Sequence, residues 1–320
     1  MSKKIILIFC IIFPYFISQA IANEKEPEEN TDRLAIFKKM EALTHVPWYY
    51  LAAIDQYESN IKKEKDESRL ISIDISEPLW FGVTNPDHLT QTEIIQISDG
   101  IGLDGNGDGL AEITNDEDVL YSMAHWITNY GIAEQDIKIA LWNYYNRALS
   151  VKSIEQIATV YKTFDTINLE ESDFPIPFQY NYTYRSTWGD ARGFGGRRIH
   201  EGTDIFASYG TPVKASRYGV VEIVGWNRFG GWRIGIRDIY NTYHYYAHLN
   251  GFTEGLSVGD VIKPGDVIGS VGSSGYGPPG TSGKFPPHLH YGMYKDNGYS
   301  EWSFDPYPYL KRWERQAKSK

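Results

Sequence analysis

The chain has 320 residues, which is more than one ordinary domain, and we expect about two domains. Its apolar and charged fractions, 42% and 22%, are ordinary for a globular protein. The formal net charge of −10 argues against a nucleic-acid partner, because such binding requires a basic patch.

The first residues have the pattern of an export signal. Lys3 and Lys4 precede an apolar run over residues 5–17, and Ala20-Ile21-Ala22 offers small residues for signal peptidase. The run is shorter than the roughly 20 residues that span a bilayer. We therefore expect a signal peptide over residues 1–22 and no stable membrane insertion after its cleavage, with an uncleaved anchor as the alternative. Cleavage also removes Cys10, the only cysteine, so the mature chain would have no disulfide.

Residues 30–165 show apolar residues at helical spacing. Pro47 suits the first turn of a helix. The apolar stripe of that helix consists of Trp48, Leu51, Ala52, Ile54 and Tyr57. Further helices are predicted over residues 116–130, 134–147 and 153–162. The sequence thus predicts a helical domain over residues 30–165 and a linker over residues 166–181, which contains two prolines.

From Tyr182 onward the sequence changes character. Glycines recur every few residues, and short runs such as residues 220–224 and 232–236 are β-branched or alternate. We expect an antiparallel β domain over residues 182–312, and therefore an α+β multi-domain fold.

Five of the eight histidines lie between residues 200 and 290. His200 and Asp204 form a His-x-x-x-Asp pair. His288 and His290 form a His-x-His pair, whose members would point to one face of a strand. Zinc is typically bound by imidazole and carboxylate, and a catalytic zinc keeps three protein ligands. The remaining histidines, among them His248, could transfer protons.

Two expectations concern the surroundings of this cluster. The alternating segment 242–248 would place His244, Tyr246 and His248 on one face of a strand. The glycine-rich segment 272–283 would wall the substrate groove. Four aromatic residues are candidates for its lining: Trp226, Phe229, Trp232 and Tyr276.

Within residues 182–310, four stretches resemble the lysostaphin-type family of peptidoglycan metallopeptidases. They are residues 195–204 (GGRRIHEGTD), 246–249 (YAHL), 259–269 (GDVIKPGDVIG) and 288–291 (HLHY). The resemblance implies hydrolysis of peptide bonds in bacterial cell wall. It implies one zinc ion on His200, Asp204 and His290, and catalytic roles for His248 and His288. His244 has no role in the family, and we expect it to be a strand residue with satisfied hydrogen bonds.

The whole chain resembles a narrower group, the sporulation-specific L-alanyl–D-glutamate peptidases of endospore-forming bacilli. Residues 47–58 (PWYYLAAIDQYE), 102–109 (GLDGNGDG) and 184–192 (YRSTWGDAR) carry this resemblance. It implies cleavage between L-alanine and D-glutamate of the stem peptide during maturation of the spore cortex. We expect an exported monomer that acts on peptidoglycan in the cell wall.

The helical half has two further patterns. Residues 52–59 resemble the helix that carries the acid in lysozyme-like lytic transglycosylases, with Glu58 at the acid position, but the segment expected downstream is missing. A degenerate lysozyme-like domain is therefore predicted. Asp104, Asn106 and Asp108 match the start of a calcium loop, but Asn115 replaces the expected glutamate. The alternative is a turn that caps the following helix.

Two alternatives for the function remain open. A wall-binding or hydrolase-activating protein without catalysis is disfavoured by the complete set of histidines and aspartate. A bifunctional enzyme with a glycan-cleaving N-terminal domain is disfavoured by the missing segment. Zinc stoichiometry and product mass would separate these possibilities.

Overall fold

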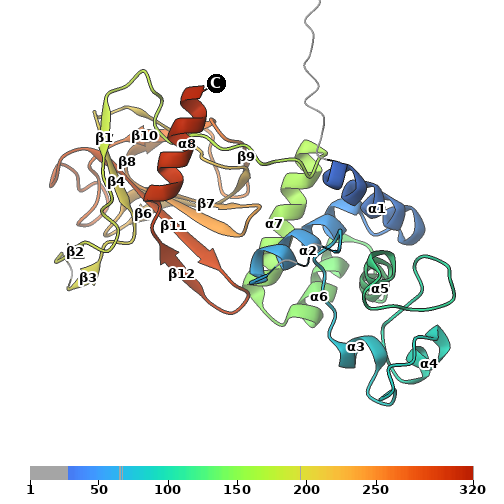
Figure 1. The fold of residues 1–320 in the computed structure, drawn as a ribbon. Coiled ribbons are helices and arrows are strands. Elements are labelled where there is room, and N and C mark those ends of the chain that lie inside the picture. Colours follow the sequence, from blue (N-terminus) through green and yellow to red (C-terminus); the bar gives the residue numbers. More distant parts are fainter. Residues whose placement is uncertain (1–27, 65, 67, 195, 320) are drawn as a thin grey trace, which may run out of the picture.

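The computed structural model describes residues 28–64, 66, 68–194 and 196–319, and the predicted signal peptide lies outside the described residues. Figure 1 shows an N-terminal half made of helices and a C-terminal half built on a sheet. The predicted α+β fold is therefore confirmed.

The helical half contains seven helices among the described residues. They are α1 (Glu28–Thr44), α2 (Trp48–Ile61), α3 (Glu77–Phe81), α4 (Thr92–Ile97), α5 (Asp116–Thr128), α6 (Glu134–Tyr145) and α7 (Ala148–Phe164). α2 begins directly after Pro47, as predicted. α5 begins after Asn115, whose side chain accepts the backbone N–H groups of Glu117 and Asp118.

The predicted limits of the later helices were less accurate. α6 ends before Asn146, which adopts a left-handed conformation with φ of 50°. α7 begins at Ala148, earlier than the predicted residue 153, because the chain turns directly from one helix into the next.

The sheet half contains β1 (Tyr182–Tyr184), β2 (Ala191–Arg192), β3 (Arg198–Ile199), β4 (Thr203–Ala207), β5 (Pro212–Lys214), β6 (Gly219–Asn227), β7 (Gly231–Asp238), β8 (Thr242–Phe252), β9 (Val261–Ile262), β10 (Val267–Val271), β11 (His288–Asp296) and β12 (Glu301–Phe304). The main sheet has the order β1-β4-β11-β8-β7-β6-β9, and β10, β5 and β12 extend it. β2 and β3 form a separate hairpin. Every strand pair is antiparallel.

A terminal helix, α8 (Tyr307–Ser319), packs on the sheet half and was not predicted. Its Leu310 and Trp313 are buried in the same core as Tyr291 of β11. The ring of Trp313 lies 6.3 Å from that of Tyr291. Adjacent strand residues point to opposite faces, so α8 covers the sheet face opposite to that of His290.

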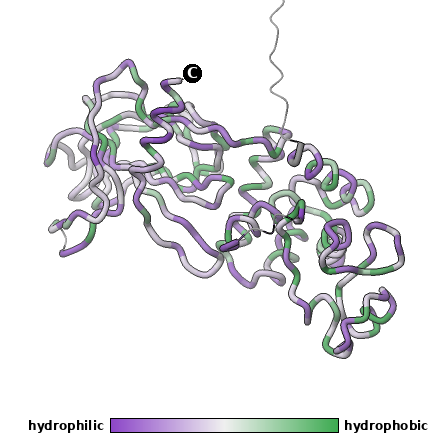
Figure 2. The backbone as a smooth tube through the Cα atoms, viewed as in Figure 1, coloured by the Kyte–Doolittle hydropathy of each residue, from purple (hydrophilic) through white to green (hydrophobic). Residues whose placement is uncertain are grey.

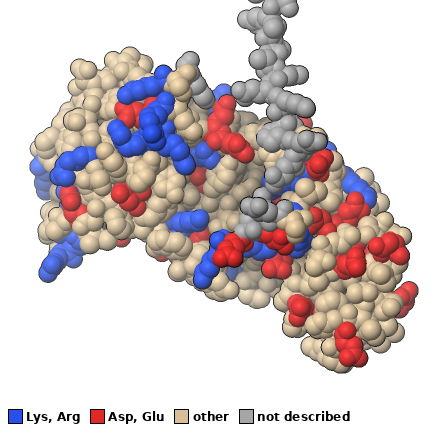
Figure 3. All heavy atoms as spheres, in the orientation of Figure 1, with Lys and Arg blue, Asp and Glu red and all other residues tan. Residues whose placement is uncertain are grey.

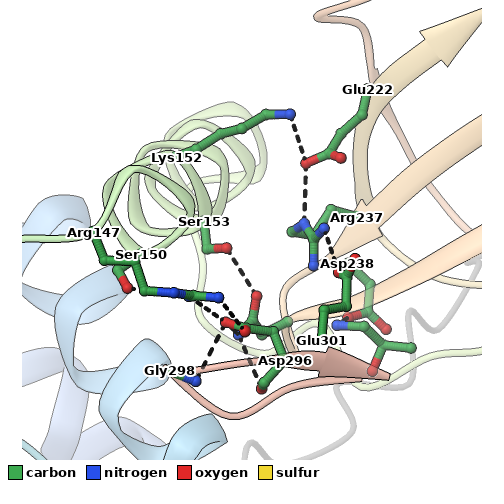
Figure 4. A network of polar contacts seen from close by, with 12 residues as sticks. Arg147, Ser150, Lys152, Ser153, Glu222, Arg237, Asp238, Asp296, Gly298 and Glu301 are labelled. Carbon is green, nitrogen blue, oxygen red and sulfur yellow. Dashed lines mark hydrogen bonds and ion pairs between the residues drawn. The ribbon is translucent and has the colours of Figure 1, made fainter. Parts of the chain in front are cut away.

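The hydrophobic core of the helical half extends onto the sheet half. Val220 of β6 and Ile239, which follows β7, belong to the core cluster formed by the helices. Polar contacts reinforce this boundary (Figure 4). Arg147 donates to both carboxylate oxygens of Asp296, at 2.8 and 2.6 Å, and Lys152 pairs with Glu222 at 3.1 Å. The helical half is thus held against the strands that carry the histidines.

In the described part of the chain, no helix is both long enough and apolar enough to cross a membrane. Figure 2 accordingly shows short hydrophobic segments that alternate with hydrophilic ones in both halves. On the face drawn in Figure 3, acidic side chains dominate the far end of the helical half, and basic side chains gather over the sheet half.

Candidate metal and catalytic site

Strand register brings the two sequence motifs together. β11 lies between β4 and β8, and His290 is directly opposite Asp204 of β4. Side chains directly opposite each other in antiparallel strands are close neighbours. His200 precedes β4 and reaches the same point. One strand pair therefore brings together Asp204 and His290, which are 86 positions apart in the sequence.

Three atoms of these residues form a compact triangle. His200 Nε2 lies 3.0 Å from Asp204 Oδ1, and His290 Nδ1 lies 3.1 Å from the same oxygen. The two ring nitrogens are 2.9 Å apart. Ligand atoms about 2.0–2.2 Å from a tetrahedral zinc would be about 3.3 Å apart, so the donor set and its spacing fit this metal. The role of the three residues as ligands stays a prediction.

Backbone carbonyls fix the tautomers of three histidines. His200 Nδ1 donates to Thr187 O at 2.8 Å. His248 Nδ1 donates to Ser274 O, and His288 Nδ1 donates to Pro286 O, both at 2.8 Å. A carbonyl oxygen only accepts, so Nδ1 carries the hydrogen in each ring. In the neutral rings, Nε2 therefore keeps its lone pair, as a ligand or a base requires.

Asp204 is held ionised although it is buried. Burial alone would raise the pKa of its carboxyl, but the polar contacts with the adjacent rings of His200 and His290 lower the pKa well below its usual range. Its second oxygen accepts Arg192 Nη2 at 2.7 Å. The carboxylate thus offers one oxygen to the triangle and the other to a guanidinium.

The pKa of His248 is well below that of a free histidine. Burial is the main cause, and the neighbouring His288 and His290 act in the same direction. Burial likewise lowers the pKa of His288. Both rings are therefore neutral near pH 7, which is the form that can accept a proton.

The prediction that His244, Tyr246 and His248 share one face is wrong. Between the pairs Ile234↔Tyr246 and Trp232↔Leu249, β8 has one residue more than β7, which is a β-bulge. His248 lies in this bulge with φ of 62°, so its ring turns away from the face of His244. It instead lies 4.8 Å from the ring of His288, measured between centroids.

His244 is the satisfied strand residue that the sequence led us to expect. Its Nδ1 lies 2.6 Å from Tyr291 Oη, and its Nε2 lies 2.9 Å from Asp238 Oδ2. The side chain is buried on the core face, next to Trp313.

An open cavity of about 400 Å³ surrounds the triangle and the two further histidines. Its walls contain Arg192, Arg198, Glu201, Phe206, Phe229, Gly230, Tyr245, Tyr276, Phe285, Pro286 and Tyr294. Two of the four aromatic candidates, Phe229 and Tyr276, are thus in the wall. Trp226 and Trp232 instead pack against each other, with their ring centroids 5.2 Å apart.

Comparison with known proteins decides the family. Residues 198–303 match peptidase family M23. The L-Ala--D-Glu endopeptidase of Bacillus subtilis (strain 168) is 59% identical over 288 residues, which cover 88% of this chain and 88% of that protein. The chain belongs to peptidase family M23. The predicted resemblance to lysostaphin-type peptidases is thereby confirmed, and the chain is a metalloendopeptidase.

Other M23 relatives match a smaller share of the chain. Lysostaphin of Staphylococcus staphylolyticus is 36% identical over 115 residues, which cover 35% of this chain and 22% of that protein. The solved catalytic domain of lysostaphin from Staphylococcus simulans is 32% identical, with a TM-score of 0.33, and the match covers 42% of this chain and 93% of that one.

Three residues of this M23 site were missed by the sequence reasoning. Arg192 reaches Asp204 across the β2–β3 hairpin, and Thr187 supports both His200 and the backbone N–H of Asp204. Gly202 leaves room for the ring of His290, because a Cβ there would lie 2.5 Å from His290 Cε1. All three lie in quoted segments, Gly202 in residues 195–204 and the other two in residues 184–192, but neither segment indicated what these side chains contact.

Glu58 is separate from this site. It lies on α2, is buried, and accepts Tyr145 Oη at 2.7 Å. Burial raises the pKa of its carboxyl to about 7, although the hydrogen bond from Tyr145 lowers it. Among the described residues, Glu58 is not in the wall of the cavity around the histidines.

The acidic segment before α5 forms turns. Asp104 Oδ1 and Oδ2 accept the backbone N–H groups of Gly107 and Gly109 at 2.6 and 2.7 Å, and Asp118 accepts that of Gly105 at 2.9 Å. The segment therefore forms turns, but α5 is capped by Asn115 rather than by these residues.

Proposed function

We propose that this M23 peptidase is a zinc-dependent endopeptidase that hydrolyses the L-Ala–D-Glu bond of peptidoglycan stem peptides. One zinc ion would be held by His200 Nε2, Asp204 Oδ1 and His290 Nδ1. The observation that carries the proposal is the triangle of these three atoms, with edges of 2.9–3.1 Å, in the wall of a cavity. The name of the Bacillus subtilis relative, which matches 88% of the chain, supports the choice of bond.

The chain's own residues supply the proton transfers. A bound zinc ion supplies Lewis acidity in such a site. His248 and His288 have neutral rings with Nε2 free of backbone contacts, and both line the cavity. One of them takes the proton of the attacking water, and the other stabilises the oxyanion or gives a proton to the leaving amine. Their fixed Nδ1–H groups keep both rings oriented throughout.

The proposal includes the organisation and location of the protein. Residues 30–165 form a helical domain, residues 166–181 a linker and residues 182–312 the peptidase domain. The protein is exported, works as a monomer in the cell wall and takes part in maturation of the spore cortex.

Digestion of defined wall fragments, followed by mass spectrometry of the products, tests this function. The mature protein should create new amino termini at D-glutamate, and a chelator should abolish the reaction until zinc is added back. His290→Ala should remove both zinc binding and activity.

The control is His244→Gln, which changes a histidine of the same sheet outside the cavity and should retain one zinc per chain. Cleavage at another peptide bond would refute the bond assignment but not the peptidase. Zinc binding without any cleavage would instead favour a wall-binding protein.

A further inference from the structure

The β2–β3 hairpin places two positive charges side by side at the catalytic cavity. Arg192 of β2 is directly opposite Arg198 of β3. Both residues are in the cavity wall. Like charges directly opposite each other in a strand pair are destabilising unless negative groups compensate them.

Only one of the two guanidinium groups has a carboxylate partner. Arg192 Nη2 donates to Asp204 Oδ2 at 2.7 Å. Arg198 Nε donates weakly to the carbonyl of Phe194 at 3.5 Å, and its guanidinium lies 5.2 Å from the ring centre of Phe229. Among the described residues, no carboxylate lies within ion-pair distance of Arg198. Its terminal nitrogens therefore remain available to an anion in the cavity.

The second acidic residue of the wall, Glu201, forms no ion pair with Arg198 in the described structure. Glu201 follows His200 and accepts Tyr294 Oη at 3.3 Å, from β11. Arg192, which is opposite Arg198 in the hairpin, contacts Asp204. An anion bound by Arg198 would therefore lie near the proposed metal ligands.

We propose that Arg198 binds a free carboxylate on the residue that supplies the leaving amine. The inference rests on the proposed function and deepens it. In a stem peptide, D-glutamate continues through its side-chain carboxyl, so its α-carboxylate is free and lies one carbon from the scissile nitrogen. Arg198 then selects an acidic residue on this side of the bond.

The geometry of arginine suits this role. Its planar guanidinium can bind a carboxylate through two parallel N–H···O bonds, which fixes orientation as well as charge. The ring of Phe229 lies against the guanidinium and limits its movement on one side. Arg198 is therefore a specificity-determining residue whose contact would orient the scissile bond.

The test uses two synthetic stem peptides that differ only at D-glutamate, with either the free α-carboxylate or the α-carboxamide. Values of kcat/KM are measured for the wild-type protein, Arg198→Gln, Arg198→Lys and Arg197→Gln. Arg197 is the matched control, because it is exposed, adjacent and outside the cavity wall. Zinc content is measured for each variant to verify that the site is intact.

The wild-type protein should prefer the carboxylate by about 10- to 100-fold, the range of a hydrogen bond to a charged group. Arg198→Gln should lose this preference through slower cleavage of the carboxylate peptide alone, and Arg198→Lys should restore part of it. Arg197→Gln should behave as wild type.

Equal rates on both peptides, or an unchanged preference in zinc-loaded Arg198→Gln, would overturn the inference while the proposed function stands. If the wild-type protein cleaves neither peptide, the proposed function fails and the inference falls with it.

Discussion

Replacing Arg147 with methionine should strongly destabilise the protein. Arg147 directly precedes α7, and its guanidinium forms two hydrogen bonds with Asp296, the last residue of β11. The carboxylate of Asp296 has no exposed surface. Methionine keeps the length of the side chain and removes only the charge and the donors.

The expected loss follows from the charge that is left behind. Removing one partner of a buried ion pair costs about 3–5 kcal/mol. Asn241 Nδ2 and the N–H of Gly298 still donate to Asp296, at 3.2 and 3.4 Å. We therefore expect the free energy of unfolding to fall by about 3 kcal/mol, the lower end of that range. This corresponds to a decrease in Tm of about 6–12 °C.

Thermal unfolding of the zinc-loaded protein measures this effect. Arg185→Met is the matched control, because Arg185 pairs with Asp190 at the surface, with side chains 77% and 45% exposed. That variant should lose less than about 1 kcal/mol. A double variant with Asp296→Asn should recover much of the loss. A decrease in Tm for Arg147→Met no larger than that of the control would refute the reasoning.

Two further predictions concern separate parts of the molecule. Gly202→Ala should weaken zinc binding at least tenfold, because the new Cβ would displace the ring of His290. Competition with a chelator measures the zinc affinity, and an unchanged affinity would contradict this prediction. Glu58→Gln should stabilise the protein at pH 8. The pKa of Glu58, about 7, lies above its ordinary value of 4.5, so the stability that its proton provides is complete below pH 4.5 and lost as pH rises through 7. Denaturant unfolding should show that Glu58→Gln raises the free energy of unfolding by about 2–3 kcal/mol at pH 8 and leaves it unchanged at pH 4. An equal effect at both pH values would contradict the raised pKa of Glu58.

The fold class and the set of histidines could be predicted because each depends on local patterns. The period of two along residues 288–290 places both rings on one face, and Pro47 marks the start of a helix. The face of His248 could not be predicted, because one extra residue in β8 depends on the partner strand. α8 was missed because its few apolar residues, such as Leu310 and Trp313, become informative only against the sheet.

The pairing of Arg192 with Asp204 could not be predicted from the sequence either. It depends on a two-residue strand pair, which is too short for a recognisable pattern. The contacts between the two halves could not be predicted either, because they depend on residues far apart in the sequence. Val220 belongs to a predicted strand, and nothing in the local sequence shows that helices cover Val220 or Ile239.

The strand β11 limits how freely the peptidase half could be exchanged between proteins. Its first residues carry His288 and His290, and its last residue, Asp296, is neutralised by Arg147 from the other half. Excision of the helices would leave a buried carboxylate without its cation and would uncover Val220 and Ile239. A chimaera that joined this catalytic sheet to a foreign wall-targeting module would need compensating substitutions on that surface. The catalytic unit of this protein is in that sense the whole described chain.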